Sequence, residues 1–278
     1  MRHVVVLIAS HNRRNLTVRA LQQLEGQTPV GIRLSAVLVD CGSTDGTAAA
    51  CEDLGDWVQV VRAPSNYFWA EAMSMAERVA QEKSPDLLLW ANDDVAFDPD
   101  ALPRLLQCYD DAASGNDDVV AIGSMRDLAG GVSYGGILFR KRISRWEHVI
   151  PGSTASHAQA ANGNFLLCSS AFADRVGGID GAFGHSFADF DWTIRASKTG
   201  AVVIVAPGYY GVCNRNSLRG TYRDPGLSAK EQWKHICSKK GLPLVPNARF
   251  LFRHGGPAWP VIWAKPYAKI LLRLASGK

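Results

Sequence analysis

Two adjacent aspartates, Asp93 and Asp94, directly follow the apolar run LLLWA at residues 87–91 and raise the question of a ligand site. A strand that is apolar on both faces belongs inside a parallel sheet, and such sheets bind ligands just outside the carboxyl ends of their strands. Adjacent carboxylates there can hold a hard divalent cation, and Mg²⁺ usually takes one or two carboxylates together with substrate phosphates. The alternative is a cap for the next helix, although Asp98 and Asp100 are better placed for that role.

A second acidic pair, Asp189 and Asp191, stands near the start of a helix that the pattern predicts over residues 187–199. Residues two apart point to different sides of a helix. One carboxylate can therefore face a cleft, while the other caps the helix or pairs with Arg195 four residues later. Capping accounts for either residue alone, but it does not easily account for both.

The elements that must position these acids form an alternating pattern. Short apolar runs with helix-like segments between them predict βαβ units and a parallel sheet with right-handed crossovers. Because the carboxyl ends of parallel strands meet at one edge, we expect the polar residues that follow each run to converge there. The runs are residues 3–9, 35–40, 57–61 and 86–91, and the polar clusters are Ser10-His11-Asn12, Asp40 with residues 42–45, Arg62 with Asn66, and Asn92-Asp93-Asp94.

The loop VDCGSTDGT at residues 39–47 combines glycines, hydroxyls and carboxylates. Asp40 or Asp45 could accept hydrogen bonds from a ribose or a base, and a capped turn is the alternative. The chain has no GxxxxGK[ST] motif, and no GxGxxG follows the first apolar run. These absences argue against a P-loop NTPase and a dinucleotide-dependent oxidoreductase.

Composition indicates an ordinary globular protein of 278 residues with 47% hydrophobic residues. The net charge of +4 does not indicate a nucleic-acid partner. The six cysteines form no CxxC pair, which favours free thiols in a reducing cytosol. No apolar stretch reaches the roughly 18 residues of a membrane span, and the first residues lack a signal-peptide cleavage site.

Five motifs, in order, resemble family 2 glycosyltransferases of the GT-A fold: VVLIASHNR, LVDCGSTDGT, WANDDVAFDPDAL, VGGIDGAF and FADFDWTIRASKTG. The resemblance implies an α/β protein with a Rossmann-like, mostly parallel sheet flanked by helices, and a small C-terminal helical appendage. It implies a catalytic domain over residues 1–206, divided into a nucleotide-binding half (1–115) and an acceptor-binding half (116–206). Residues 207–278 would form a helical tail, basic and aromatic in composition.

The resemblance also implies roles for individual residues. Asp189 would be the catalytic base of an inverting transfer, and Asp94 with Asp93 would hold Mg²⁺ or Mn²⁺. The remaining expected site residues are Ser10, His11, Asn12, Asp40, Ser43, Asp45, Asn66 and Asp93 for the nucleotide, and Asn162, Asp191, Trp192 and Arg195 as supporting or acceptor-side groups.

The chain departs from the family pattern at three places. Asn92 replaces the usual first aspartate of the DxD motif, which weakens metal affinity. The glycine-rich segment after the third run is replaced by Tyr67, Phe68 and Trp69, which either reshape the sugar pocket or belong to the core. A late metal-binding histidine is missing from GYYGVCNRNS, so that His235 and His254 are only candidates for it.

The expected function is transfer of a sugar from a nucleotide-diphosphate donor to a saccharide or a lipid-linked saccharide, in the building of a bacterial surface polysaccharide such as O-antigen. Basic and aromatic residues alternate over residues 249–278, which favours either peripheral contact with the inner face of the cell membrane or a packed helix with a solvated face. The alternatives are a sugar nucleotidylyltransferase, which would need a glycine-rich loop after the first run, and a non-catalytic module that binds nucleotide-sugars or glycans.

Overall fold

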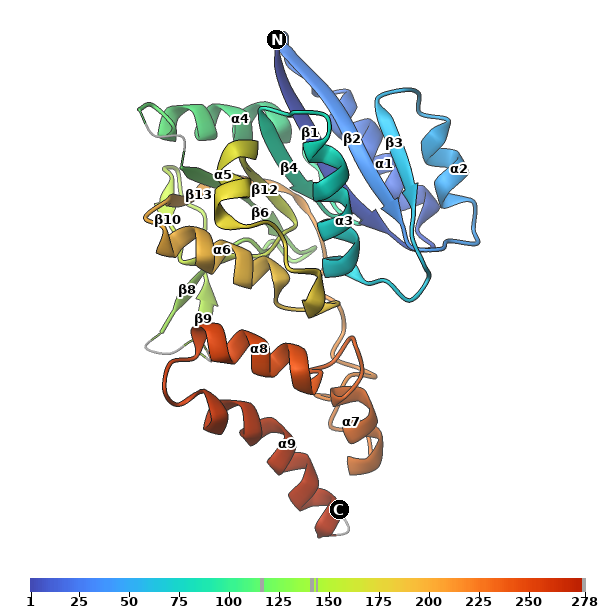
Figure 1. Cartoon of the computed structure of the whole chain (residues 1–278), viewed down its shortest axis with the longest axis vertical. Helices are drawn as coiled ribbons and strands as arrows, with labels where there is room; N and C mark the ends of the chain where they lie inside the picture. Colours follow the sequence, from blue (N-terminus) through green and yellow to red (C-terminus); the bar gives the residue numbers. More distant parts are fainter. Residues whose placement is uncertain (116–117, 141–142, 144, 277–278) are drawn as a thin grey trace.

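The computed structural model describes residues 1–115, 118–140, 143 and 145–276, and places a helix-covered sheet above a group of C-terminal helices (Figure 1). The helices are α1 (Arg14–Glu25), α2 (Thr47–Glu52), α3 (Trp69–Gln81), α4 (Ala101–Ala112), α5 (Ser170–Val176), the 3₁₀ turn η1 (Gly181–Phe183), α6 (Ala188–Lys198), α7 (Ala229–Ile236), α8 (Leu244–His254) and α9 (Trp259–Ala275). The strands are β1 (Arg2–Ser10), β2 (Ile32–Asp40), β3 (Val58–Arg62), β4 (Leu87–Ala91), β5 (Ala96–Phe97), β6 (Val119–Arg126), β7 (Val132–Tyr134), β8 (Gly136–Phe139), β9 (Trp146–His148), β10 (Ser156–His157), β11 (Ala160–Ala161), β12 (Phe165–Ser169) and β13 (Val202–Val212).

The four apolar runs form the parallel strands β1 to β4, in the spatial order β4-β1-β2-β3. The predicted parallel α/β pattern is therefore confirmed. The register sets Ser10 opposite Asp40, and Asp40 opposite Arg62. This pairing brings the polar ends of the strands to one edge of the sheet.

Helices cover both faces of the sheet, which is why its strands are apolar throughout. Val5 and Leu7 of β1 point into the core shared with α3, α5 and α6, while Val4 and Ile8 point into the core shared with α1, α2 and α4. All four side chains are fully buried. The two layers hold the strand ends, and the loops that leave them, in fixed positions.

The second half of the sheet is mixed. Strand β12 runs antiparallel between β4 and β6, and β13 pairs with β6 in parallel. Strands β8 and β9 pair antiparallel in a small separate sheet with β11. The domain boundary was expected after residue 206, a position that lies inside β13. Pro207 has no N–H to donate, but it lies at a break of register between Val205 and Tyr209, and the strand resumes after it.

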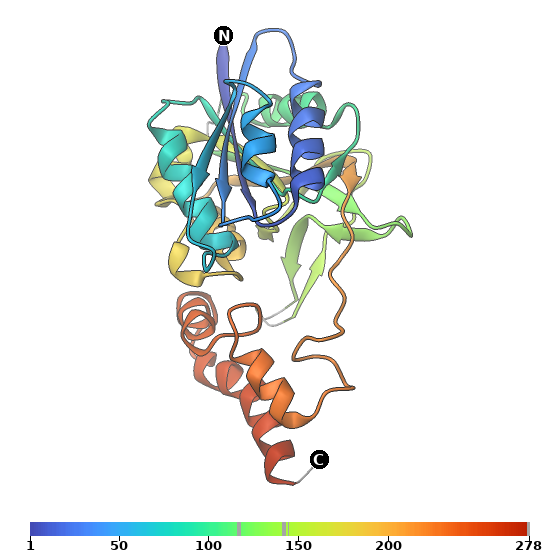
Figure 2. The ribbon, with the colours of Figure 1, turned by 90° about the vertical axis from the view of Figure 1, so that its right-hand side faces the viewer.

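The C-terminal helices follow a connection that runs down from β13 (Figure 2). Helix α9 packs against α7 and α8 around Ile236, Tyr267 and Ile270, and α8 lies against α6 and η1. The helical appendage predicted from the sequence is therefore present. Among the helices that the structure describes, none is long and apolar enough to cross a membrane.

Candidate functional site

A cavity of about 660 Å³ opens at the carboxyl ends of β1 and β4. The strand-end loops form one wall, and the loop before α6 forms another. The cavity brings together six of the residues expected from the sequence: Ser10, His11, Asp93, Asp94, Asn162 and Asp189. A pocket outside the carboxyl ends of parallel strands is where ligands of such sheets bind.

The two aspartates that follow β4 face a guanidinium group from the loop after β1. Arg13 Nη1 lies 2.8 Å from Asp93 Oδ1 and 2.9 Å from Asp94 Oδ2. Asp93 is 4% exposed, and burial raises its pKa, although the charge of Arg13 opposes the rise. The two carboxylates thus converge on one point, which the guanidinium of Arg13 occupies.

The two carboxylates suit a divalent cation whose remaining ligands come from a bound substrate. The two carboxylates reach a single nitrogen of Arg13, so they could also reach one metal ion. In the described part of the chain, no group of three or more His, Cys, Asp or Glu side chains could hold a metal. Two carboxylates with phosphate oxygens from a substrate form the usual shell of Mg²⁺, so the residues present fit such an ion.

Asp189 faces the cavity from the first turn of α6. Its Oδ1 accepts a hydrogen bond from the backbone N–H of Phe190 at 2.9 Å, and its Oδ2 accepts one from Gly163 at 3.2 Å. Burial raises the pKa of Asp189, and these two hydrogen bonds offset part of the rise. A half-buried carboxylate with a raised pKa, held by backbone donors at the cavity wall, is suited to accept a proton.

Asp191 points the other way, as the two-residue spacing predicts. Its carboxylate is fully buried and pairs with Arg195 at 2.9 Å, with Arg253 at 3.1 Å and with His254 at 2.8 Å. Burial alone would raise the pKa of Asp191, but the hydrogen bonds from His254 and Arg195 outweigh it and lower the pKa to about 2. Asp191 therefore fastens α6 to α8 and does not line the cavity.

Three of the expected nucleotide-binding residues brace the loops behind the cavity. Asn12 Oδ1 accepts from the backbone N–H of Thr44 at 2.8 Å, and Ser43 Oγ accepts from that of Asn12 at 2.8 Å. Asp45 accepts from the backbone N–H groups of Arg14 and Thr47. These residues hold the β1 and β2 loops together, and their side chains do not line the cavity.

Asp40 ends β2 with one oxygen satisfied and one not. Oδ2 accepts from the backbone N–H of Ser43 at 3.1 Å. Oδ1 is buried and has no hydrogen-bond partner among the residues that the structure describes. Asp40 does not itself line the cavity, but its strand neighbour Ser10 and the next residue, Cys41, do, so that this unpaired acceptor lies directly behind the cavity wall.

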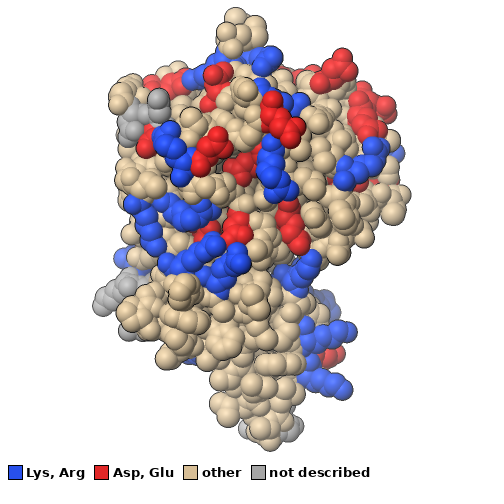
Figure 3. Space-filling model, in the orientation of Figure 1, with Lys and Arg blue, Asp and Glu red and all other residues tan. Residues whose placement is uncertain are grey.

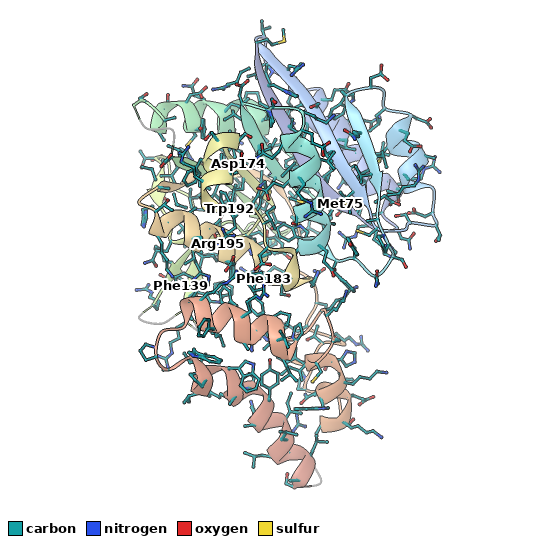
Figure 4. All side chains as sticks on the ribbon, viewed as in Figure 1. Met75, Phe139, Asp174, Phe183, Trp192 and Arg195 are labelled. Carbon is teal, nitrogen blue, oxygen red and sulfur yellow. The ribbon has the colours of Figure 1, made fainter. Side chains whose placement is uncertain are left out.

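Other expected residues lie away from the cavity. Trp192, which was expected as a supporting or acceptor-side group and is labelled in Figure 4, is fully buried in the core, where its ring packs against Trp90. Asn66 lies outside the cavity lining, and its carbonyl accepts from Lys239 at 2.7 Å. Neither candidate histidine, His235 nor His254, lines the cavity.

Several cavity residues were not predicted from the sequence. Arg13 was not assigned a role, although its position in the polar loop after the first strand could have suggested one. Cys213, which stands where a late histidine was sought, has its Sγ 3.5 Å from Asp94 Oδ1. Lys240 reaches the cavity from the C-terminal part. The sequence had left open whether Tyr67, Phe68 and Trp69 shape the pocket or belong to the core; all three line the cavity, and Trp69 Nε1 donates to Asn92 Oδ1 at 2.9 Å.

Comparison with known proteins identifies the family. Among solved structures, GalNAc-T7 with UDP, GalNAc and Mn²⁺ is similar over 84% of this chain and 47% of its own chain, with 13% identity and a TM-score of 0.58. The mannosyltransferase PcManGT from Pyrobaculum calidifontis, in complex with GDP-Man and Mn²⁺, is similar over 99% of this chain and 74% of its own, with 17% identity and a TM-score of 0.55. The chain thus spans about half the length of the GalNAc-T7 chain.

No curated protein sequence matches the chain. The two structural similarities establish the fold, which is the expected GT-A fold. The family model described as glycosyl transferase family 2 matches residues 5–165, which is more than half of the chain and includes the β1 loop, the acidic pair after β4 and the start of β12. The protein therefore belongs to glycosyl transferase family 2.

Proposed function

We propose that the protein transfers a sugar, with inversion at the anomeric carbon, from a nucleotide-diphosphate donor to a hydroxyl group of a saccharide or lipid-linked saccharide. The observation that carries the proposal is the cavity itself. Asp189 lines it from the first turn of α6, and the pair Asp93 and Asp94 lines it from the loop after β4. Inversion by single displacement requires these two functions: a base for the acceptor hydroxyl, and positive charge for the departing diphosphate.

Asp189 takes the proton from the acceptor hydroxyl as the new bond forms. Burial raises its pKa, which makes the ionised carboxylate a better proton acceptor than an ordinary aspartate. The Gly163 and Phe190 N–H groups fix the direction of the carboxylate. A divalent cation bound by Asp93 and Asp94 would supply Lewis-acid stabilisation of the diphosphate. No covalent glycosyl-enzyme is needed, so no nucleophile is assigned.

The donor site is proposed at the strand-end loops. The similar structures contain UDP in one case and GDP-Man in the other, which supports a nucleoside diphosphate as the donor class. The buried Oδ1 of Asp40, without a partner among the described residues, offers an acceptor for an N–H or O–H group of the base or ribose. A nucleotidylyltransferase is less well supported, because the loop ASHNRRN after β1 contains no glycine.

The acceptor is proposed to be presented at a membrane surface, in the synthesis of a bacterial surface polysaccharide. Charge is strongly segregated along the chain: residues 207–278 contain thirteen Lys and Arg against two Asp and Glu, whereas residues 1–206 contain seventeen against twenty-four. Figure 3 shows a largely uncharged face on the C-terminal helices, bordered by Lys and Arg. This combination matches an anionic lipid surface, which attracts clustered basic residues.

Helix α9 contributes an unpaired apolar and basic face to this surface. Tyr267 and Ile270 are buried against the other C-terminal helices. At 100° per residue, Val261, Lys265 and Leu272 fall on the opposite side of the helix. Val261 is 72% exposed and Leu272 is 71% exposed. Apolar side chains flanked by lysine on an exposed helix face are typical of helices that lie in the membrane interface.

The catalytic proposal is tested with Asp189→Asn. A screen of UDP, GDP, dTDP and CMP with Mn²⁺ by thermal shift identifies the nucleotide, because a ligand at 100 times its Kd stabilises by about 2.7 kcal/mol. With the matching nucleotide-sugar, the variant is expected to keep donor binding and to lose transfer and donor hydrolysis by about 10²–10⁴-fold. Full activity in this variant would disprove the assignment of the base. An unreacted donor in the wild-type protein would instead favour a binding module.

The membrane proposal is tested by co-sedimentation with phosphatidylcholine vesicles, with and without phosphatidylglycerol. Reversing Lys265 and Lys269 to Glu is expected to weaken binding to the anionic vesicles at least about tenfold, since each basic residue near such a surface contributes about 1 kcal/mol. The matched control reverses Arg19 and Lys83 in the sheet-bearing part and should bind as the wild type does. Equal binding by both variants, or none by the wild type, would contradict a membrane role.

A further inference from the structure

The side chain of Arg13 occupies the point on which both acidic ligands converge. A single nitrogen, Nη1, lies within 2.9 Å of a carboxylate oxygen of each neighbouring aspartate, Asp93 and Asp94. The arginine comes from the loop between β1 and α1, eighty residues away in the sequence. Any cation bound between the same two oxygens would have to displace this guanidinium.

The surroundings allow the side chain of Arg13 to move while its backbone stays fixed. The backbone N–H donates to Thr47 Oγ1 at 3.3 Å, and the carbonyl accepts from the backbone N–H of Thr17 at 2.9 Å. The side chain is 41% exposed, in contrast to the 6% of Asp93. A long, partly exposed side chain on a fixed backbone can exchange one anion for another at small cost.

We propose that Arg13 is an internal counter-cation, which makes binding of the divalent ion depend on the donor's diphosphate. The inference rests on the function proposed above. A divalent ion that binds alone must break two ion pairs and leave the guanidinium without a partner in a cavity that Lys240 also lines. A diphosphate brings negative oxygens that pair with both the ion and the displaced guanidinium.

Thermodynamic linkage turns this competition into a measurable coupling. If the nucleotide strengthens binding of the ion by some factor, the ion strengthens binding of the nucleotide by the same factor. The guanidinium competes with the ion for the two carboxylates when no nucleotide is present, and it pairs with the diphosphate when the nucleotide is bound. Removal of its charge abolishes both interactions. Both changes reduce the coupling, so the affinity of the ion alone should rise while its dependence on the nucleotide falls.

The experiment measures Mn²⁺ binding directly, from the electron paramagnetic resonance signal of free Mn²⁺, with and without UDP or GDP. Arg13→Gln is compared with the wild type and with Arg14→Gln, which makes the same change of charge at a neighbouring exposed arginine. Arg13→Gln is expected to bind Mn²⁺ alone about tenfold more tightly, and its enhancement by nucleotide is expected to fall by about the same factor, which corresponds to about 1.4 kcal/mol. Arg14→Gln should match the wild type.

The outcomes separate the inference from the function on which it rests. If the wild type binds Mn²⁺ and a nucleotide, and Arg13→Gln binds Mn²⁺ alone no more tightly than the wild type, the role of Arg13 is overturned while the function stands. If neither Mn²⁺ nor any nucleotide binds the wild type, both are overturned. Should Arg13→Gln fail to fold, Arg13→Met replaces it, because methionine keeps a long unbranched side chain without the positive charge and should also bind Mn²⁺ alone more tightly than the wild type.

Discussion

Glu77 on α3 provides the sharpest prediction about stability. The side chain is 5% exposed, its Oε2 accepts from the backbone N–H of Ile179 at 2.6 Å, and its Oε1 has no hydrogen-bond partner among the described residues. Burial raises the pKa of Glu77 from 4.5 to about 7, against the opposing hydrogen bond from Ile179. The folded protein therefore favours the protonated form of Glu77, whereas the unfolded chain releases this proton at a lower pH.

The sign and size of the effect follow from this difference in pKa. Below pH 4.5 the side chain is protonated in both states and costs nothing. As the pH rises through 7, the unfolded chain gains from ionisation and the folded protein gains less, so stability is lost. One pKa unit corresponds to about 1.4 kcal/mol, so the rise of the Glu77 pKa from 4.5 to about 7 corresponds to about 3 kcal/mol.

Glu77→Gln removes this titration while it keeps an oxygen for the Ile179 N–H group. The free energy of unfolding, measured by urea at pH 4.5, 6 and 8, should change with pH by about 3 kcal/mol more in the wild type than in the variant. The variant gains relative to the wild type as the pH rises. Glu82→Gln, at an exposed position just after the same helix, is the matched control and should follow the wild-type curve. Parallel curves for the wild type and Glu77→Gln would refute the reasoning.

Two further predictions concern the ion pairs that hold α6 and the packing of the cavity wall. Asp191→Asn should lower the free energy of unfolding at pH 7 by about 2 kcal/mol, because the folded pKa of about 2 lies below the unfolded value of 3.8. In urea titrations, the difference between the variant and the wild type should disappear as the pH falls from 4 to 2. A deficit that persists at pH 2 would contradict this cause. Gly163→Ala would place a Cβ 2.7 Å from ring atoms of Trp69, so we expect a loss of about 1–3 kcal/mol in thermal unfolding and altered tryptophan fluorescence. An unchanged melting curve would show that the ring can move aside.

Local patterns in the sequence were enough to predict the first half of the fold. The four strands are short apolar runs between helix-like segments, and the convergence of their polar ends follows from parallel pairing alone. The opposite directions of Asp189 and Asp191, and the pair of Asp191 with Arg195, follow from helical spacing. Each of these features depends on residues close together in the chain.

Features that depend on distant contacts could not be predicted in the same way. The ion pairs of Arg13 join residues eighty positions apart, and the contact between Cys213 and Asp94 joins residues 119 positions apart. Burial of Trp192 did have a local signal: Ala188, Trp192 and Ala196 recur every four residues, and all three are fully buried. The continuation of β13 past Pro207 had none, since it depends on pairing with β6.

The ion pairs and hydrogen bonds between α8 and α6 restrict which C-terminal helices can be combined with this catalytic sheet. Asp191 contacts Arg195 in the sheet-bearing part, and it contacts Arg253 and His254 of α8. A chain cut after Val212 would keep the buried carboxylate of Asp191 but lose two of its partners. Asp191 lies only two residues from Asp189, so the loss would fall next to the cavity. Exchange of the C-terminal helices between relatives would therefore succeed only when this carboxylate and its partners are exchanged together.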